Sequence, residues 1–170
     1  SIRTVLNYYV YAEDIDSDGI LELPGLITMK PVTSWREDEQ KFLLRWYSMD
    51  VDGWEMDKLY TFHNYNGGWY LQLGSEWASR LTVEQEHGCF RFYVWDESYQ
   101  VATPLFSLYV LTGSDRDESA AQDGRFPLYR SEGVAYAAQL DFSAPEYGVT
   151  EKSLQESFHL IRQDWQTGDT

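Results

Sequence analysis

Leu105-Phe106-Ser107-Leu108-Tyr109-Val110-Leu111 is the stretch that decides the fold class. Apolar side chains stand at both alternating sets of positions, so both faces of the strand that it predicts are expected to be covered. A strand covered on both faces belongs in the middle of its sheet. A second stretch, 41–49, has the same character and predicts another central strand, because Phe42, Leu44 and Trp46 alternate with Leu43, Arg45 and Tyr47.

Shorter strands are predicted around these two, and turn signals rich in Gly, Asp and Asn separate them. They cover residues 7–12, 20–29, 58–64, 69–73, 81–86, 90–95, 126–130 and 134–140. Short turns join antiparallel neighbours, so antiparallel sheets are expected. Asp52-Gly53 between two of the strands predicts a hairpin with a type I′ turn.

The clearest predicted helix covers residues 150–163. Thr150 suits the N-cap position, and one apolar stripe follows at helical spacing, formed by Leu154, Phe158, Ile161 and Trp165. The fold class is therefore α+β: a predominantly antiparallel β-sheet with a C-terminal amphipathic helix and an N-terminal four-stranded meander. We expect residues 1–65 to form the meander and residues 66–170 an α+β domain, with the option that the two pack as one unit.

Charge excludes several classes of partner. The 170 residues hold 28 acids and 13 bases, a formal net charge of −15. A nucleic-acid binder needs a basic face to displace counterions, and docking on anionic lipid needs one too. Cations, neutral sugars and polypeptides remain as partners. The single Cys89 excludes an internal disulfide, and no apolar run is long enough for a transmembrane helix.

One motif carries specific chemistry. Residues 14–22 read Asp-Ile-Asp-Ser-Asp-Gly-Ile-Leu-Glu, which places a carboxylate at every second position before a glycine. Carboxylates at this spacing converge on one ion, and Ca²⁺ takes six to eight oxygen ligands as general ion chemistry. Predicted ligands are the side chains of Asp14, Asp16, Asp18 and Glu22 and the backbone carbonyl of Ile20. An EF-hand is excluded, because Gly25 stands where the bidentate Glu belongs and the flanks have strand periodicity.

A nine-residue loop of this kind between strands resembles the calcium hairpins of FG-GAP/VCBS repeats. The resemblance covers residues 5–30 and extends to a four-stranded blade over 1–65; it rests on the three Asp, Gly19, Ile20 and Glu22. It implies a Ca²⁺ cofactor. The alternative for the motif alone is a polar hairpin turn, since Asp favours turns. Only one copy of the motif is present, whereas a propeller needs several blades.

A second resemblance covers residues 66–170. The order of segments is similar to the PsbP-like fold and to small Firmicutes lipoprotein domains that look like it. The segments that carry it are Gly68 to Leu73, Glu76-Trp77, Leu81 to Val83, Phe90 to Trp95, Leu105 to Val110, Val134 to Leu140 and the helix with Ser157-Phe158. It implies an antiparallel sheet flanked by helices and a non-catalytic binding or accessory role.

Function is expected to be that of an exported or surface-attached bacterial module with a structural calcium site and no enzymatic activity. A start at Ser1 rather than Met indicates that a signal or lipoprotein segment has been removed. One alternative is a cell-envelope carbohydrate- or protein-binding module that uses Trp35 and Trp54, which stand in predicted turns. Another is a hydrolase built on paired carboxylates, for which Glu76, Asp96 and Glu97 are the acids to inspect.

Overall fold

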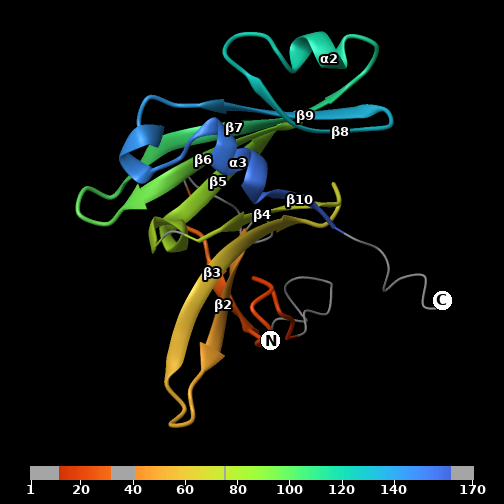
Figure 1. The fold of residues 1–170 in the computed structure, drawn as a ribbon. Coiled ribbons are helices and arrows are strands. Elements are labelled where there is room, and N and C mark those ends of the chain that lie inside the picture. Colours follow the sequence, from red (N-terminus) through yellow and green to blue (C-terminus); the bar gives the residue numbers. More distant parts are fainter. Residues whose placement is uncertain (1–11, 32–40, 75, 162–170) are drawn as a thin grey trace, which may run out of the picture.

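The computed structural model describes residues 12–31, 41–74 and 76–161 and contains two five-stranded sheets (Figure 1). Neighbouring strands in both are antiparallel. The first sheet has the order β1 (Leu23–Thr28), β2 (Phe42–Met49), β3 (Glu55–Asn64), β4 (Trp69–Leu73) and β10 (Phe158–Leu160). The second has the order β5 (Leu81–Glu86), β6 (Cys89–Asp96), β7 (Val101–Thr112), β9 (Val134–Leu140) and β8 (Phe126–Ser131).

Helices in the described residues are few and short. They are η2 (Glu76–Arg80) between β4 and β5 in the chain, α2 (Arg116–Ser119) after β7, η3 (Ala144–Tyr147) and α3 (Glu151–Ser157). The predominantly antiparallel β architecture predicted from the sequence is therefore present. The stretch 105–111 lies in β7, the middle strand of its sheet, and the stretch 41–49 forms β2 between β1 and β3.

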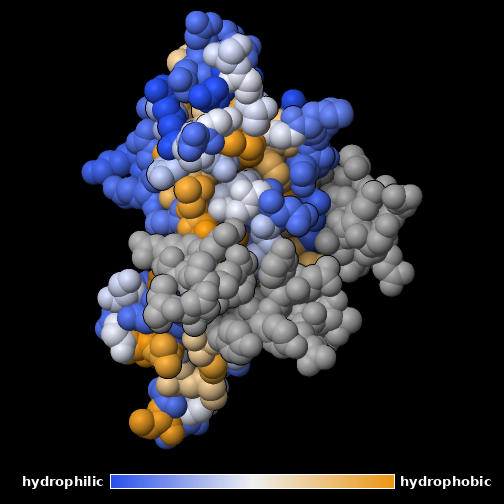
Figure 2. Space-filling view, turned by 90° about the vertical axis from the view of Figure 1, so that its right-hand side faces the viewer, coloured by the Kyte–Doolittle hydropathy of each residue, from blue (hydrophilic) through white to orange (hydrophobic). Residues whose placement is uncertain are grey.

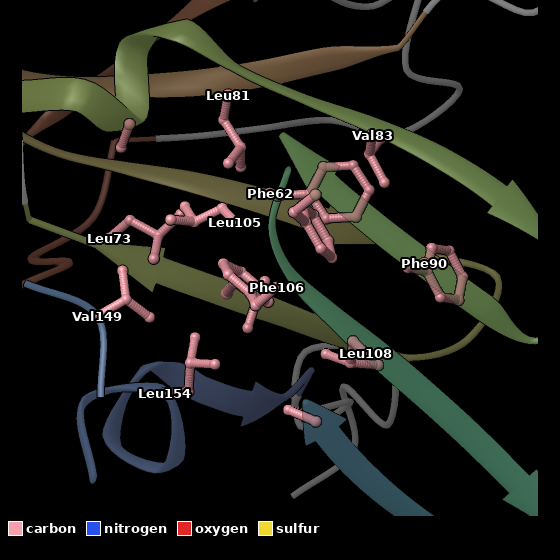
Figure 3. Packing of buried hydrophobic residues seen from close by; sticks show 14 of the residues in the cluster. Phe62, Leu73, Leu81, Val83, Phe90, Leu105, Phe106, Leu108, Val149 and Leu154 are labelled. Atoms are coloured by element: carbon pink, nitrogen blue, oxygen red, sulfur yellow. The ribbon is translucent and has the colours of Figure 1, made fainter. Parts of the chain in front are cut away.

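The main core lies between the two sheets. Phe62 of β3 meets Phe92 of β6 edge to face at 5.3 Å, and Trp69 of β4 meets Phe90 at 5.0 Å. Figure 3 shows Phe106 and other side chains of the second sheet converging with Phe62 of the first and with residues near α3. Both sheets thus bury their inner faces against each other, which accounts for the alternation along most strands.

The predicted helix over 150–163 is wrong in its second half. Thr150 caps α3 as expected, with its Oγ1 accepting from the Ser153 backbone N–H at 3.1 Å. The chain then leaves the helix at Phe158 and pairs with β4 as β10. Residues 158–160 also alternate with a period of two, and the open edge of β4 supplies the backbone partners that select the strand. Only Leu154 of the predicted stripe lies in the helix, and Trp165 falls outside the described residues.

The N-terminal meander is described only in part. Its first predicted strand, 7–12, lies almost wholly outside the described residues, and the next begins at Leu23 rather than at Ile20. The predicted hairpin after β2 is present, but its turn type is wrong. A type I′ turn needs positive φ at both central residues, and in this turn only Gly53, at +85°, has it. The turn is instead closed by a Gly53 N–H to Asp50 carbonyl bond of 3.1 Å.

The boundary predicted between residues 65 and 66 falls in the turn between β3 and β4. These two strands pair with each other, with His63 opposite Tyr70. One apolar cluster contains Leu43 and Phe62 from before this turn together with Phe106 and Leu154 from after it. The described parts of both segments therefore share a sheet and a core.

Replacing Phe92 by Ala tests the inter-sheet core. Phe92 is 1% exposed and also stacks on Phe106 at 4.8 Å. The cavity left behind is expected to lower the free energy of unfolding by about 3–5 kcal/mol, measured by urea denaturation. Tyr99→Ala removes another ring, one that is 78% exposed, and is expected to change stability by less than about 0.5 kcal/mol. Equal losses in the two variants would contradict this assignment of the core.

Candidate metal centre

The Asp-rich segment forms a closed loop before β1. Glu13 and Glu22 form a short antiparallel bridge, with N···O distances of 3.1 and 2.9 Å, and the loop runs between them. Gly19 has φ of +87°, the conformation for which a glycine was expected at the sixth position of the motif. Ser17 also has positive φ, at +60°. The loop therefore joins extended segments, as the flanking periodicity predicted.

Backbone N–H groups of the loop hold its aspartates in place. Asp14 accepts from the Asp18 N–H at 2.9 Å and from the Gly19 N–H at 2.8 Å through its two carboxylate oxygens. Asp18 Oδ1 accepts from the Ile20 N–H at 2.8 Å. This bond is the main reason that the pKa of Asp18 is lowered from its usual value. The loop is consequently ordered by hydrogen bonds from its own backbone to Asp14 and Asp18.

Four carboxylates meet at this loop. Asp14, Asp16, Asp18 and Glu22 each bring one carboxylate oxygen within 4.8 Å of the others. Oxygen atoms from carboxylates are the ligands that hard divalent cations prefer. The structure therefore brings together the four side chains that the sequence predicted as ligands, and this group can hold a metal ion. The role of the Ile20 carbonyl stays a prediction.

Glu22 is unlike the three aspartates because it is completely buried, at 0% exposure. Its Oε2 accepts from the Ile15 N–H at 3.0 Å, whereas Oε1 has no hydrogen-bond partner within the described part of the chain. Burial raises the pKa of Glu22, and the neighbouring Asp16, Asp18 and Asp14 raise it further. An ionised carboxylate in this position is unfavourable unless a cation accompanies it. The orphaned oxygen is thus available as a ligand in a group that could hold a metal ion.

A small apolar cluster fastens the loop to the first sheet, on the side away from the main core. Ile15 of the loop packs with Leu44, Trp46 and Leu59. The Gln72 side chain of β4 also donates to the Ile15 carbonyl at 3.4 Å. Ile15, which lies between the first two candidate ligands, is therefore anchored by the sheet, and this anchor positions the loop.

One charged group at the site was missed by sequence reasoning. Lys58 of β3 places its Nζ 3.2 Å from Asp18 Oδ2, although 40 residues separate the two in sequence. No local signal could have found this contact, because it depends on how β3 lies against the loop.

A cavity of about 570 Å³ adjoins the loop. Asp16 and Lys58 contribute to its wall, as do Trp77, Tyr147 and His159. Trp77 is fixed there by an indole N–H bond of 3.0 Å to the Tyr147 carbonyl. Of the acids inspected for a hydrolase, none lines this cavity. Asp96 instead caps a turn by accepting from the Ser98 and Tyr99 N–H groups at 2.9 and 3.1 Å.

Of the two tryptophans predicted as ligand-binding residues, only Trp54 lies in the described part of the chain. Trp54 lies at the end of the β2–β3 hairpin and is 73% exposed. Trp35 lies outside the described residues. The structure therefore supports an exposed ring at the first position and does not bear on the second.

Comparison with known proteins adds no relative: no family model, curated protein or solved structure matches the chain. Among the described residues, no helix has the length and apolar character needed to cross a bilayer. The arguments for function accordingly rest on the loop and on the surface around it.

A buried histidine elsewhere in the first sheet makes stability depend on pH. His63 stacks on Tyr70 at 4.8 Å, and its Nδ1 is buried with no hydrogen-bond partner. Burial lowers the pKa of His63 to about 4. The unfolded chain takes up this proton near the ordinary value of about 6.5, whereas the folded protein does not until about pH 4. His63 therefore stabilises the fold above pH 6.5, and that contribution falls as the pH drops from 6.5 to 4.

We expect the loss to reach about 3 kcal/mol at pH 4. Urea denaturation at several values between pH 7 and pH 4 measures it, with His63→Phe as the variant that keeps an aromatic ring without the titration. The difference between the two proteins isolates His63 from the many carboxylates that titrate in the same range. Parallel pH profiles for both proteins would contradict this account.

Proposed function

We propose that the chain is a calcium-binding module in which one Ca²⁺ ion stabilises the Asp-rich loop. The observation that carries the proposal is the completely buried Glu22, whose Oε1 has no partner while three aspartates crowd the same point. Asp14, Asp16, Asp18 and Glu22 are the side-chain ligands of this proposal, and the Ile20 carbonyl is its backbone ligand. The role is structural, since the ion offsets the repulsion among the four carboxylates.

Calcium is favoured over magnesium by the kind of site. The ligands come from one loop, all are oxygen atoms, and Ca²⁺ accepts irregular shells of six to eight oxygens. Mg²⁺ demands near-ideal octahedral geometry and keeps several waters. Extracellular calcium modules bind at about 10⁻⁴–10⁻³ M, which fits an exported or surface-attached bacterial protein. The resemblance of residues 14–22 to FG-GAP/VCBS hairpins supports the same placement, and we propose a non-catalytic accessory role.

Thermal unfolding in EDTA and in a Ca²⁺ series up to 10 mM tests this function. A ligand bound only by the native state at 100 times its dissociation constant adds about 2.7 kcal/mol, so the Tm is expected to rise by about 5–10 °C. Mg²⁺ at the same concentrations is expected to give a smaller rise. Asp16→Asn is expected to weaken the response to Ca²⁺ because it removes one charged ligand.

Glu22→Gln is the sharper variant, because the substitution should not destabilise the ion-free protein but should remove the stabilisation by Ca²⁺. In EDTA its Tm is expected to equal or exceed that of the native protein, since a buried, repelled carboxylate is gone. In Ca²⁺ the Tm rise is expected to be lost. Glu132→Gln, a matched change in the exposed β8–β9 turn, should keep the full response. A response retained in both Asp16→Asn and Glu22→Gln would overturn the proposed site.

A second candidate function, binding of a polypeptide partner, is favoured by an exposed apolar arm. We define the arm as residues 20–23 together with the β2–β3 hairpin, which projects away from the second sheet (Figure 1). Seven of the eleven large apolar side chains exposed in the described residues lie on it: Ile20, Leu21, Leu23, Met49, Val51, Trp54 and Met56. Figure 2 shows hydrophobic atoms at the end of this projection. Apolar surface gathered in this way marks interaction sites.

The arm is preorganised and acidic. Asp50 Oδ1 accepts from the N–H groups of Asp52 and Trp54, both at 2.9 Å, which fixes the hairpin end. Arg45 pairs with Glu55 at 2.6 Å and with Asp57, which ties the two strands together. The arm, residues 20–23 and 42–64, holds five acids and two bases. The chemistry that complements this surface is a polypeptide segment with both apolar and basic side chains, rather than an anionic membrane.

An immobilised peptide of alternating Lys and Leu is the probe for this second function. Trp54→Ser is expected to weaken binding about tenfold or more, as loss of a central aromatic contact does. Tyr99→Ser, which removes an exposed ring elsewhere, should leave binding unchanged. Equal effects of the two changes would reduce the binding to unspecific charge attraction. Chito-oligosaccharide tested in parallel covers the carbohydrate alternative, which a Trp54-dependent signal with the sugar alone would favour.

A further inference from the structure

A β-bulge lies beside the proposed calcium loop. Between β2 and β3 the register shifts, so that Trp46 faces Leu59 while the next residue, Tyr47, faces Asp57. Lys58 is thereby the extra residue of β3, without an opposite partner on β2. A bulge redirects the side chain at its position and is typical of sites where that direction matters. Leu59, the neighbour of Lys58, packs with Ile15 of the loop, and regular alternation would turn Lys58 to the opposite face. At the bulge both residues instead reach the loop.

The Lys58 ammonium is placed among the candidate ligands. Its Nζ lies 3.2 Å from Asp18 Oδ2. The hydrogen bond and the charge of Asp18 raise the pKa of Lys58 most. The charges of Asp16 and Glu22 raise this pKa further, so the ammonium also interacts with these two carboxylates. Three of the four clustered carboxylates therefore interact with this one ammonium. Lys58 partly neutralises the loop in the structure as it stands.

We propose that Lys58 is a built-in counter-cation that competes with Ca²⁺ for Asp18 and so sets the affinity of the loop. This inference rests on the proposed function and goes beyond it by naming the residue that regulates the site. In the ion-free protein the ammonium occupies Oδ2 of Asp18. When Ca²⁺ binds, the ammonium either leaves that oxygen or stays next to a divalent cation, and both alternatives disfavour the ion.

The sign of the effect follows from the two charges. A positive charge near a divalent cation raises the free energy of the bound state, whereas the same charge near carboxylates lowers the free energy of the ion-free state. Removing it should therefore strengthen Ca²⁺ binding and weaken the ion-free fold. A residue that only supported the loop structurally would weaken both states when removed. The two roles thus predict opposite changes in affinity.

Calorimetric titration of the whole chain with CaCl₂ tests the inference in Lys58→Met. The dissociation constant for Ca²⁺ is expected to fall about tenfold at low ionic strength. The gain should shrink in 0.5 M NaCl, where a Debye length of about 4 Å screens the ammonium from the ion. In EDTA the Tm of Lys58→Met should be slightly below that of the native protein, while its rise with saturating Ca²⁺ should be larger.

Two control variants separate charge from structure. Lys58→Arg keeps the charge and is expected to keep the native affinity within about twofold. Arg130→Met removes one positive charge from β8 of the second sheet, where Arg130 pairs with Asp117 at 3.5 Å, and should leave affinity unchanged. This control matters because any loss of a base makes the protein more acidic overall.

The outcomes distinguish this inference from the proposed function. Native protein that binds Ca²⁺ with an affinity that Lys58→Met leaves unchanged or weakens would overturn the role of Lys58 alone. Absence of binding to both proteins would overturn both the calcium function and the inference. Binding of Ca²⁺ by Lys58→Met but not by the native protein would support competition between Lys58 and Ca²⁺. It would also show that Lys58 keeps Ca²⁺ out of the native loop.

Discussion

The apolar layer between the two sheets is the constraint on which the other features depend. Aromatic rings from β3, β4, β6 and β7 meet there, and Phe92 contacts both Phe62 and Phe106. Because the inner face of the first sheet is committed to this layer, its opposite face is free to carry something else. That opposite face holds the cluster of Leu44, Trp46 and Leu59 onto which the Asp-rich loop is fastened by Ile15. The position of the candidate metal centre thus follows from the way the sheets pack.

The loop itself combines two requirements that conflict without a cation. Its backbone N–H groups hold Asp14 and Asp18 close together, and its closing residue, Glu22, is buried with one oxygen that has no hydrogen-bond partner among the described residues. Desolvation and like charges both oppose ionisation of Glu22. Lys58 relieves part of this conflict from outside the loop, at Asp18, and leaves the buried oxygen unmatched. A divalent ion within the cluster would offset the repulsion among the carboxylates and would also give the buried Glu22 oxygen a partner, which is the physical basis of the calcium proposal.

Sequence reasoning succeeded where the relevant interactions are local. The four clustered side chains lie within nine consecutive residues, so their spacing alone predicts that they converge, and they do. The central strands were predictable because both of their faces are apolar, and the cap of α3 because Thr150 bonds within its own first turn. Prediction from the sequence failed where the same residues fit two local structures equally well. Phe158 fits both a helical stripe and an alternating strand, and the hairpin end at Asp50 to Gly53 fits more than one turn type.

What the sequence by itself determined is the antiparallel β character, the strand centres and the spacing of the carboxylates in the loop. Only the tertiary structure decided that residues 158–160 close the first sheet against β4, that Glu22 is buried, and that a bulge turns Lys58 toward Asp18. The physical reason is range. Turn, cap and spacing effects act within a few residues, whereas burial and strand pairing depend on residues brought together from 40 to 90 positions apart in the chain.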